Sequence, residues 1–176
     1  MLGEKTKKNL EEAFAGESMA RNKYDYFSSI FRKAGYVQIA NIFAETALNE
    51  KEHAKLLAKL LGYISEDIKE DLKAAIDGEL HETNSMYPRM MQEALEEGHK
   101  DIAKLFKEVG EVEADHAARY QKLLANIENG EVFKRAEVKR WKCNNCGHIH
   151  EGTEAPLVCP ACSHPQAHFE ILAENY

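Results

Sequence analysis

The sequence predicts a mainly α-helical protein in which an antiparallel four-helix bundle precedes a small β region. The first observation is the helical periodicity of residues 4–128, a stretch that holds only one of the four prolines, Pro88. The second is the change of pattern over 131–176, where the other three prolines, all four cysteines and strand-like runs such as 168–172 occur together. The two patterns indicate two parts with separate cores.

Three glycines divide the first pattern into four helical stretches. Gly35, Gly62 and Gly98 separate stretches near 5–33, 37–61, 66–97 and 100–128. Short connections between long helices favour an antiparallel bundle. Asn129 and Gly130 then provide a natural helix C-cap. We therefore expect a helical domain over 1–130, a linker over 131–140 and a small domain over 141–176.

Composition argues against several classes of function. With 176 residues, of which 44% are hydrophobic, the chain can bury a core and still carry a small appendage. It holds no apolar run of about 18 residues and no apolar segment behind a basic N-terminus, so neither a membrane span nor a signal peptide is predicted. A net charge of −7 disfavours broad binding to nucleic acid or anionic lipid. We expect a cytoplasmic protein without nucleic-acid or membrane partners.

Two Cys-x-x-Cys pairs lie close together in the C-terminal region. Cys143 and Cys146 form the first pair, and Cys159 and Cys162 follow after twelve residues. A secreted disulfide framework would spread its cysteines along the chain, so this clustering favours metal binding. A tetrahedral site of four thiolates suits iron or zinc, and the spacing taken alone favours structural zinc.

The helical region contains an internal repeat. Ala13-x-x-Gly16-Glu17 recurs as Ala75-x-x-Gly78-Glu79 at a shift of 62, and Ile39-Ala40-x-x-Phe43 recurs as Ile102-Ala103-x-x-Phe106 at a shift of 63. The shift of 63 also relates Glu50-x-x-His53 to Glu113-x-x-His116. The bundle is therefore interpreted as a duplicated helical hairpin in which each copy carries one Glu-x-x-His motif.

Helical spacing directs acidic groups into the bundle. Steps of four and three residues along each helix trace an apolar stripe interrupted by Glu17, Glu50, Glu79, Glu82 and Glu113. One such group alone is usually a solvated charge. A set in register, with only Arg89 as a marginal basic neighbour, needs a compensating cation. One glutamate from each of two helices and Glu-x-x-His from each of the other two is the pattern of ferritin-like di-iron and di-manganese bundles.

Longer motifs extend this pattern over the chain. They are ESMARNKY at 17–24, NEKEH at 49–53, GELHE at 78–82 followed by Met86-Tyr87-Pro88, EADH at 113–116, and the two cysteine pairs. Together they resemble the rubrerythrin family along essentially the whole sequence. That family joins a ferritin-like di-iron four-helix bundle to a C-terminal rubredoxin-like domain.

The resemblance implies which residues hold metal. The di-iron ligands would be Glu17, Glu50, Glu79, Glu82, Glu113 and His116, with His53 as an alternative ligand. Tyr24 and Tyr87 would be hydrogen-bonding groups beside the centre, or would simply pack in the core. The four cysteines would hold one iron ion, with zinc as the other possibility. Ser163 departs from the rubredoxin-like pattern, which usually has glycine there, and would cost about 1 kcal/mol if φ is positive.

The resemblance also implies a ligand exchange. Five glutamates outweigh the charge of two ferrous ions and fall short of the charge of two ferric ions, so the fifth carboxylate favours the oxidised state. Exchange of Glu82 for neutral His53 on one iron would restore the balance on reduction. The resemblance implies that such a carboxylate-for-imidazole exchange occurs in this family.

The function expected from the resemblance is the reduction of hydrogen peroxide to water, a defence against oxidative stress. Electrons would enter through the iron tetrathiolate from rubredoxin or an NAD(P)H-dependent reductase, and the chain would form a homodimer. The basic stretch 133–142 is a solvated connector or, less simply, a docking patch for an acidic donor protein. Two alternatives stay open: a ferroxidase that handles iron, and a zinc-ribbon binding module on a structural bundle.

Overall fold

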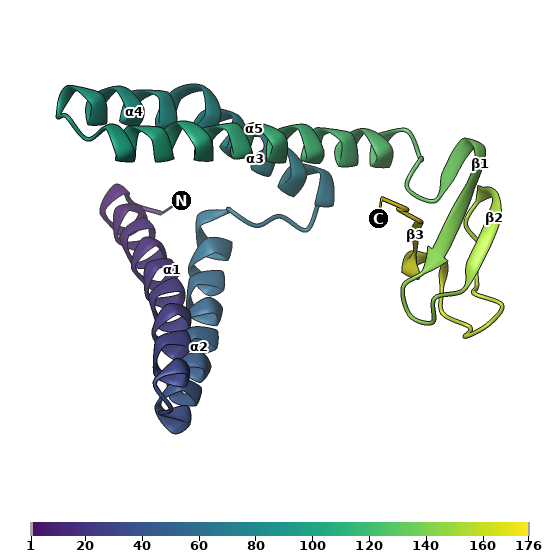
Figure 1. Ribbon diagram of the computed structural model, residues 1–176, viewed down its shortest axis with the longest axis horizontal. Coiled ribbons are helices and arrows are strands. Elements are labelled where there is room, and N and C mark those ends of the chain that lie inside the picture. The colour runs from purple at the N-terminus through teal and green to yellow at the C-terminus, as the bar shows by residue number, and fades with distance from the viewer. Residues whose placement is uncertain (1, 176) are drawn as a thin grey trace. The chain divides into compact units, whose positions relative to one another are not determined.

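The computed structural model describes residues 2–175, which form two compact units with a boundary between Asp71 and Leu72. Residues 1 and 176, the outer ends of the two predicted domains, lie outside the described residues. The α-helices precede the strands along the described chain, as predicted (Figure 1), and one short 3-10 helix, η2 over Gln166–His168, lies between β2 and β3. Over the same residues, no helix is long and apolar enough to cross a membrane.

The first unit is built on a hairpin of two long helices, α1 over Glu4–Lys33 and α2 over Val37–Leu61 (Figure 1). Gly35 forms the turn with φ of 86°, a conformation that glycine adopts at little cost. The buried residues of α2 are Ala40, Ala47, Ala54 and Ala58. Their small side chains let the helices approach, and the Ser28 hydroxyl donates to the Ala40 carbonyl at 2.8 Å. The first two predicted helices are confirmed.

A short connection over 62–67 follows α2. Gly62 ends the helix in the left-handed conformation, with φ of 73°. The backbone N–H of Lys69 donates to the Asp67 carboxylate at 2.8 Å, which satisfies a donor in the first turn of the next helix. The short connection predicted between the second and third helices is therefore confirmed.

The stretch predicted as one helix over 66–97 is divided into three elements. They are α3 over Ile68–His81, the π-helix η1 over Glu82–Met86, and α4 over Tyr87–Glu96. The Tyr87 N–H donates to the Glu82 carbonyl five residues earlier, so this turn is wider than an α-helical turn. Pro88 follows and has no N–H with which to continue α-helical bonding. The prediction of one uninterrupted helix is wrong.

The last helix, α5 over Lys100–Glu128, packs against α4 through small residues. The buried positions are Ala94 on α4 and Ala103, Gly110 and Ala117 on α5. Asn129 is the C-cap of α5, and Gly130 follows with φ of 68°, so the predicted helix end is confirmed.

The C-terminal region is a three-stranded antiparallel sheet in the order β2-β1-β3. The strands are β1 over Lys134–Cys143, β2 over Ile149–Glu154 and β3 over Phe169–Ile171. Trp141 is fully buried, and its indole N–H donates to the Gly152 carbonyl at 2.9 Å. Trp141 packs in a small core with Cys143, Ala155, Cys159 and Phe169. Cysteines that could bind metal are therefore part of the core itself.

Most of the predicted linker, 131–140, lies in β1, which pairs with β2. Several basic side chains of the stretch 133–142 face acidic partners: Arg135 with Glu131, Lys139 with Glu137, and Lys142 with Glu170. This local pairing offsets the positive charge that would attract an acidic donor protein. It disfavours the docking-patch interpretation of this segment. The domain boundaries at 130 and 141 stay a prediction.

The cross-strand pair of Lys142 and Glu170 predicts a small acid sensitivity. Their charged atoms lie 3.1 Å apart, and hydrogen bonds from Lys142 and then Asn144 lower the pKa of the Glu170 carboxyl from 4.5. A group of this kind stabilises the fold above its unfolded pKa, and the contribution is lost as pH falls through the folded pKa. Glu170→Gln should therefore cost a few tenths of a kcal/mol at about pH 7, as exposed pairs do.

Thermal unfolding followed by the emission of Trp141 measures this effect. The difference between the variant and the parent should shrink as the pH is lowered to about 4, because the parent carboxyl becomes protonated in the unfolded chain. A difference that stays constant over this range would mean that the Glu170 charge is not its source.

Candidate metal centres

Glu17, Glu50 and His53 form the first trio. α1 supplies Glu17, and the i, i+3 spacing on α2 places Glu50 and His53 on one face. The His53 Nδ1 lies 2.8 Å from a Glu50 oxygen and 3.6 Å from a Glu17 oxygen. All three residues offer ligand atoms within 4.8 Å of one another. The structure thus brings together three of the predicted ligands in the first unit.

The charges of the first trio are coupled. The hydrogen bond with Glu50 raises the pKa of Glu17, and the same bond lowers the pKa of Glu50. The hydrogen bond to Glu50 also raises the pKa of His53. The negative charges of two adjacent carboxylates thus favour the binding of protons in this trio. A divalent metal ion supplies the same compensation, and carboxylate with imidazole is a donor set that iron accepts.

Glu79, Glu113 and His116 form the second trio. α3 supplies Glu79, and α5 presents Glu113 and His116 with the same i, i+3 spacing. The His116 Nδ1 lies 2.7 Å from a Glu113 oxygen and 3.6 Å from a Glu79 oxygen. Burial, followed by the hydrogen bond with Glu113, raises the pKa of Glu79. These three residues again offer ligand atoms within 4.8 Å of one another.

The two trios repeat one geometry. In both, the histidine Nδ1 lies 2.7–2.8 Å from the glutamate of its own helix and 3.6 Å from the glutamate of the neighbouring helix. The duplicated hairpin therefore produces two copies of one half-site. His53 has the same position in the first trio as His116 has in the second. The first hairpin therefore places His53 for metal binding as well as the second hairpin places His116.

Three other predicted residues lie outside the trios. Glu82 lies in η1 and is not part of either cluster among the described residues. Burial raises the pKa of the Tyr87 phenol, and the charges of Glu82 and both glutamates of the second trio raise it further. Tyr24 packs against Phe43, with ring centroids 5.8 Å apart. Tyr24 is thus observed as a packing residue.

The four cysteines converge on one point at the end of β1. Cys143 and Cys162 have sulfurs 3.7 Å apart, as do Cys146 and Cys159, and all four sulfurs are within 4.8 Å. None forms a disulfide among the described residues. Metal–sulfur bonds of about 2.3 Å in a tetrahedron give sulfur–sulfur edges of roughly 3.8 Å. The observed spacing therefore fits a tetrahedral metal ion.

The two cysteine pairs lie on matching turns. The Cys143 N–H donates to the His148 carbonyl, and the Cys159 N–H donates to the His164 carbonyl, each at 2.8 Å. The backbone N–H of His164 is the main cause that lowers the pKa of Cys162 to about 6. The His148 N–H acts in the same direction on Cys146, but the neighbouring thiols and burial outweigh it and raise that pKa to about 12. Four thiolates can coexist here only with a cation.

Ser163 has φ of 59°, so the positive φ considered for this position is confirmed. Its counterpart in the first turn is Gly147, with φ of 79°. Both N–H groups donate to the first cysteine carbonyl of their pair, at 2.9 and 2.8 Å. The serine therefore pays a conformational cost that glycine would not.

Ser163→Gly should stabilise the sheet region by somewhat less than about 1 kcal/mol, because the relief of strain is partly offset by a more flexible unfolded chain. Gly147→Ala, at the matching position, should destabilise it by about 1 kcal/mol. Thermal unfolding of the metal-loaded protein measures both changes. Equal shifts of the same sign would contradict the assignment of strain to Ser163.

Comparison with known proteins agrees with this geometry. The family described as rubrerythrin matches residues 8–124, and the family described as the rubrerythrin rubredoxin-like domain matches residues 141–170. Rubrerythrin-1 of Clostridium acetobutylicum is 50% identical over 100% of this chain and 98% of its own length. The rubrerythrin of Nitratidesulfovibrio vulgaris is 46% identical, with the same two coverages. The structure of partially reduced nigerythrin is 32% identical over 98% of this chain and 88% of that chain, with a TM-score of 0.37.

The two family matches confirm the predicted fold class. The chain is mainly α-helical, with ferritin-like helices and a small C-terminal rubredoxin-like sheet region. The four cysteines form the rubredoxin-like metal site, and the two trios are the carboxylate and histidine clusters of a di-iron protein.

Proposed function

The chain belongs to the rubrerythrin family, and on that premise we propose that it reduces hydrogen peroxide to water at a di-iron centre fed with electrons through the cysteine-bound iron. The observation that carries this proposal is the presence of both kinds of redox site on one chain. A carboxylate-rich site for two irons can react with peroxide. A one-electron tetrathiolate site is needed only if that centre must be reduced again.

The proposed iron ligands are those that the rubrerythrin family implies for this chain. The two oxidised irons would be held by Glu17, Glu50, Glu79, Glu82, Glu113 and His116. On reduction, His53 would replace Glu82. The matching geometry of His53 and His116 supports this exchange, because each imidazole is already beside two carboxylates of its trio. Glu82, in the π-helix, would be the ligand that changes.

The reaction needs two electrons and two protons for each hydrogen peroxide, and it yields two water molecules. When bound, two ferrous ions supply the electrons that break the O–O bond. The protein groups beside them handle protons. Burial, followed by the charges of Glu82, Glu113 and Glu79, raises the pKa of the Tyr87 phenol, so this group stays protonated at neutral pH. Tyr87 is therefore available to donate a hydrogen bond at the centre.

Electrons would enter at the cysteine site. Cys146 is exposed, whereas Cys143 and Cys159 are buried, so the site has one open edge toward solvent. We propose that a rubredoxin or an NAD(P)H-dependent reductase delivers electrons at this edge, and that the chain works as a homodimer in the cytoplasm. The clustering of all four cysteines in two Cys-x-x-Cys pairs, which favours metal binding over a disulfide framework, supports a reducing compartment.

The colour of the purified protein tests this proposal. Oxidised protein from its native host should be coloured by sulfur-to-iron charge transfer, should bleach on reduction and should regain its colour when peroxide is added. Metal analysis of the same sample should find three irons for each chain. A colourless protein with stoichiometric zinc at the cysteines would overturn the electron-inlet role.

A further inference from the structure

The two copies of the hairpin differ in length by one residue. Glu17 and Glu79 are sixty-two positions apart, whereas Tyr24 and Tyr87 are sixty-three apart. The second copy therefore has one more residue between its glutamate and its tyrosine. The π-helix over Glu82–Met86 lies in that interval. An added residue in a helix is accommodated as a π-turn, so the π-helix accounts for the difference.

After this interval the two copies are in register again. Helix α1 ends at Lys33 and α4 ends at Glu96, a separation of sixty-three positions. The following turn glycines, Gly35 and Gly98, keep this separation and have φ of 86° and 85°. The added residue thus changes one turn of the second hairpin and leaves the rest of the repeat in place.

Opposite the π-helix, α5 has a glycine where α2 has an alanine. Gly110 is the repeat counterpart of Ala47, and both positions are buried. A Cβ added to Gly110 would lie 3.1 Å from the Cβ of Tyr87, which is tighter than ordinary van der Waals contact, and 3.6 Å from its Cγ, which is an ordinary contact. The first hairpin accommodates a methyl group at this place in the repeat. The absence of a methyl group at Gly110 therefore leaves room for Tyr87, the residue that directly follows the π-helix.

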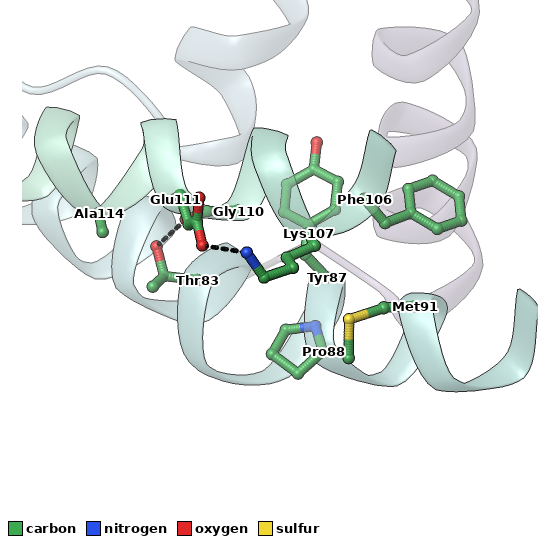
Figure 2. A pocket seen from close by; sticks show the side chains of 9 residues that line it. All are labelled: Thr83, Tyr87, Pro88, Met91, Phe106, Lys107, Gly110, Glu111 and Ala114. Carbon is green, nitrogen blue, oxygen red and sulfur yellow. Dashed lines mark hydrogen bonds and ion pairs between the residues drawn. The ribbon is translucent and has the colours of Figure 1, made fainter. Parts of the chain in front are cut away.

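Further contacts hold this part of the hairpin together. The Thr83 hydroxyl, in the π-helix, donates to the Gly110 carbonyl at 3.4 Å. The Tyr87 ring lies beside Phe106, with centroids 6.1 Å apart. Figure 2 shows the Tyr87 hydroxyl directed away from Pro88 and Met91. Those two side chains and Tyr87 help to line a cavity of about 280 Å³.

We propose that the added residue and Gly110 together act as a positioning device that seats the Tyr87 ring against α5, the helix that carries Glu113 and His116. Gly110 is a positioning residue, because the three atoms nearest to a Cβ at this position all belong to Tyr87. The effect of this device on peroxide chemistry rests on the proposed function. The coupling between the π-helix and Gly110 does not, so it can be tested without metal.

Gly110→Ala in the full-length, metal-free protein tests the first half of the device. Gly78→Ala is the matched control, because Gly78 is also helical and a Cβ added there meets nothing within 4 Å. The control should raise the unfolding midpoint by about 2–4 °C, since alanine favours helix. Gly110→Ala should lower the midpoint despite the same gain, and should shift the ring resonances of Tyr87, which Tyr87→Phe assigns.

Deletion of Asn84 tests the second half. Asn84 is exposed within the π-helix, and its removal gives the second hairpin the spacing of the first. In that background, position 110 should tolerate alanine as position 47 does. The double variant should therefore regain most of the midpoint lost in Gly110→Ala, and the Tyr87 resonances should become the same with glycine or alanine at 110.

The outcomes separate this inference from the proposed function. Rescue of Gly110→Ala by the deletion would support the device, whether or not the protein reduces peroxide. The inference is overturned if Gly110→Ala behaves like Gly78→Ala or if the deletion fails to rescue it. It is equally overturned if the deletion alone unfolds the helices, because the added residue would then not be an insertion into a repeat that folds without it.

Discussion

Replacing Cys159 with serine should abolish donor-dependent peroxide turnover and leave the helices folded. Cys159 is 1% exposed and lies in the small core around Trp141, so the variant loses both a thiolate ligand and a packed side chain. The rate with rubredoxin and an NAD(P)H-dependent reductase should fall by more than about 100-fold. Helical circular dichroism should stay near that of the parent, because the helices do not share this core.

Two controls complete this experiment. Ser163→Gly changes a residue of the same turn that is not a ligand, and should keep full turnover. Cys146→Ser removes an exposed ligand, so it should lose donor-dependent turnover with less disturbance of Trp141 emission. Turnover at the parent rate in Cys159→Ser would show that electrons reach the di-iron centre by another route.

Glu82→Ala and His53→Ala should have opposite effects on the two redox states. Glu82→Ala removes one negative charge beside two ferric ions, so it should weaken the oxidised state while two irons still bind through the remaining ligands. His53→Ala should leave the reduced state short of a ligand and slow peroxide turnover by more than about tenfold, with a smaller effect on simple iron oxidation.

Glu52→Ala is the matched control, because Glu52 is an exposed neighbour of His53 on α2 and pairs only at the surface with Lys55. Crystal structures of the oxidised and reduced forms, together with the rate of peroxide-dependent oxidation, measure the exchange. The ligand exchange is disproved if one iron keeps the same ligands in both states and His53→Ala turns over peroxide at the parent rate.

The repeated part of the candidate sites could be predicted from the sequence. Glu50-x-x-His53 and Glu113-x-x-His116 lie on uninterrupted helices, so their i, i+3 spacing is enough to place both side chains on one face. The four cysteines were predictable for a similar reason. Each pair lies in its own local turn, and the two turns bring the four sulfurs together.

The π-helix was not predicted, although the sequence contains the signal. The repeat shift is 62 between Glu17 and Glu79 but 63 between Tyr24 and Tyr87, so the second copy has one added residue. A helix accommodates such a residue as one wider turn. Helical periodicity alone does not show this, because a single wide turn displaces the pattern by only one position. The strand over Lys134–Cys143 was missed because its basic residues resemble a linker until β2 is seen to pair with it.

Rapid mixing of the fully reduced, anaerobic protein with hydrogen peroxide tests the central claim most directly. The return of the sulfur-to-iron colour reports oxidation at the cysteines while peroxide consumption is followed in the same sample. We expect one peroxide to be consumed for every two electrons lost, the colour to return during that reaction, and oxygen to react more slowly. Cysteine-bound iron that stays reduced while peroxide disappears, or oxygen that reacts as fast as peroxide, would contradict the proposed function and favour a ferroxidase.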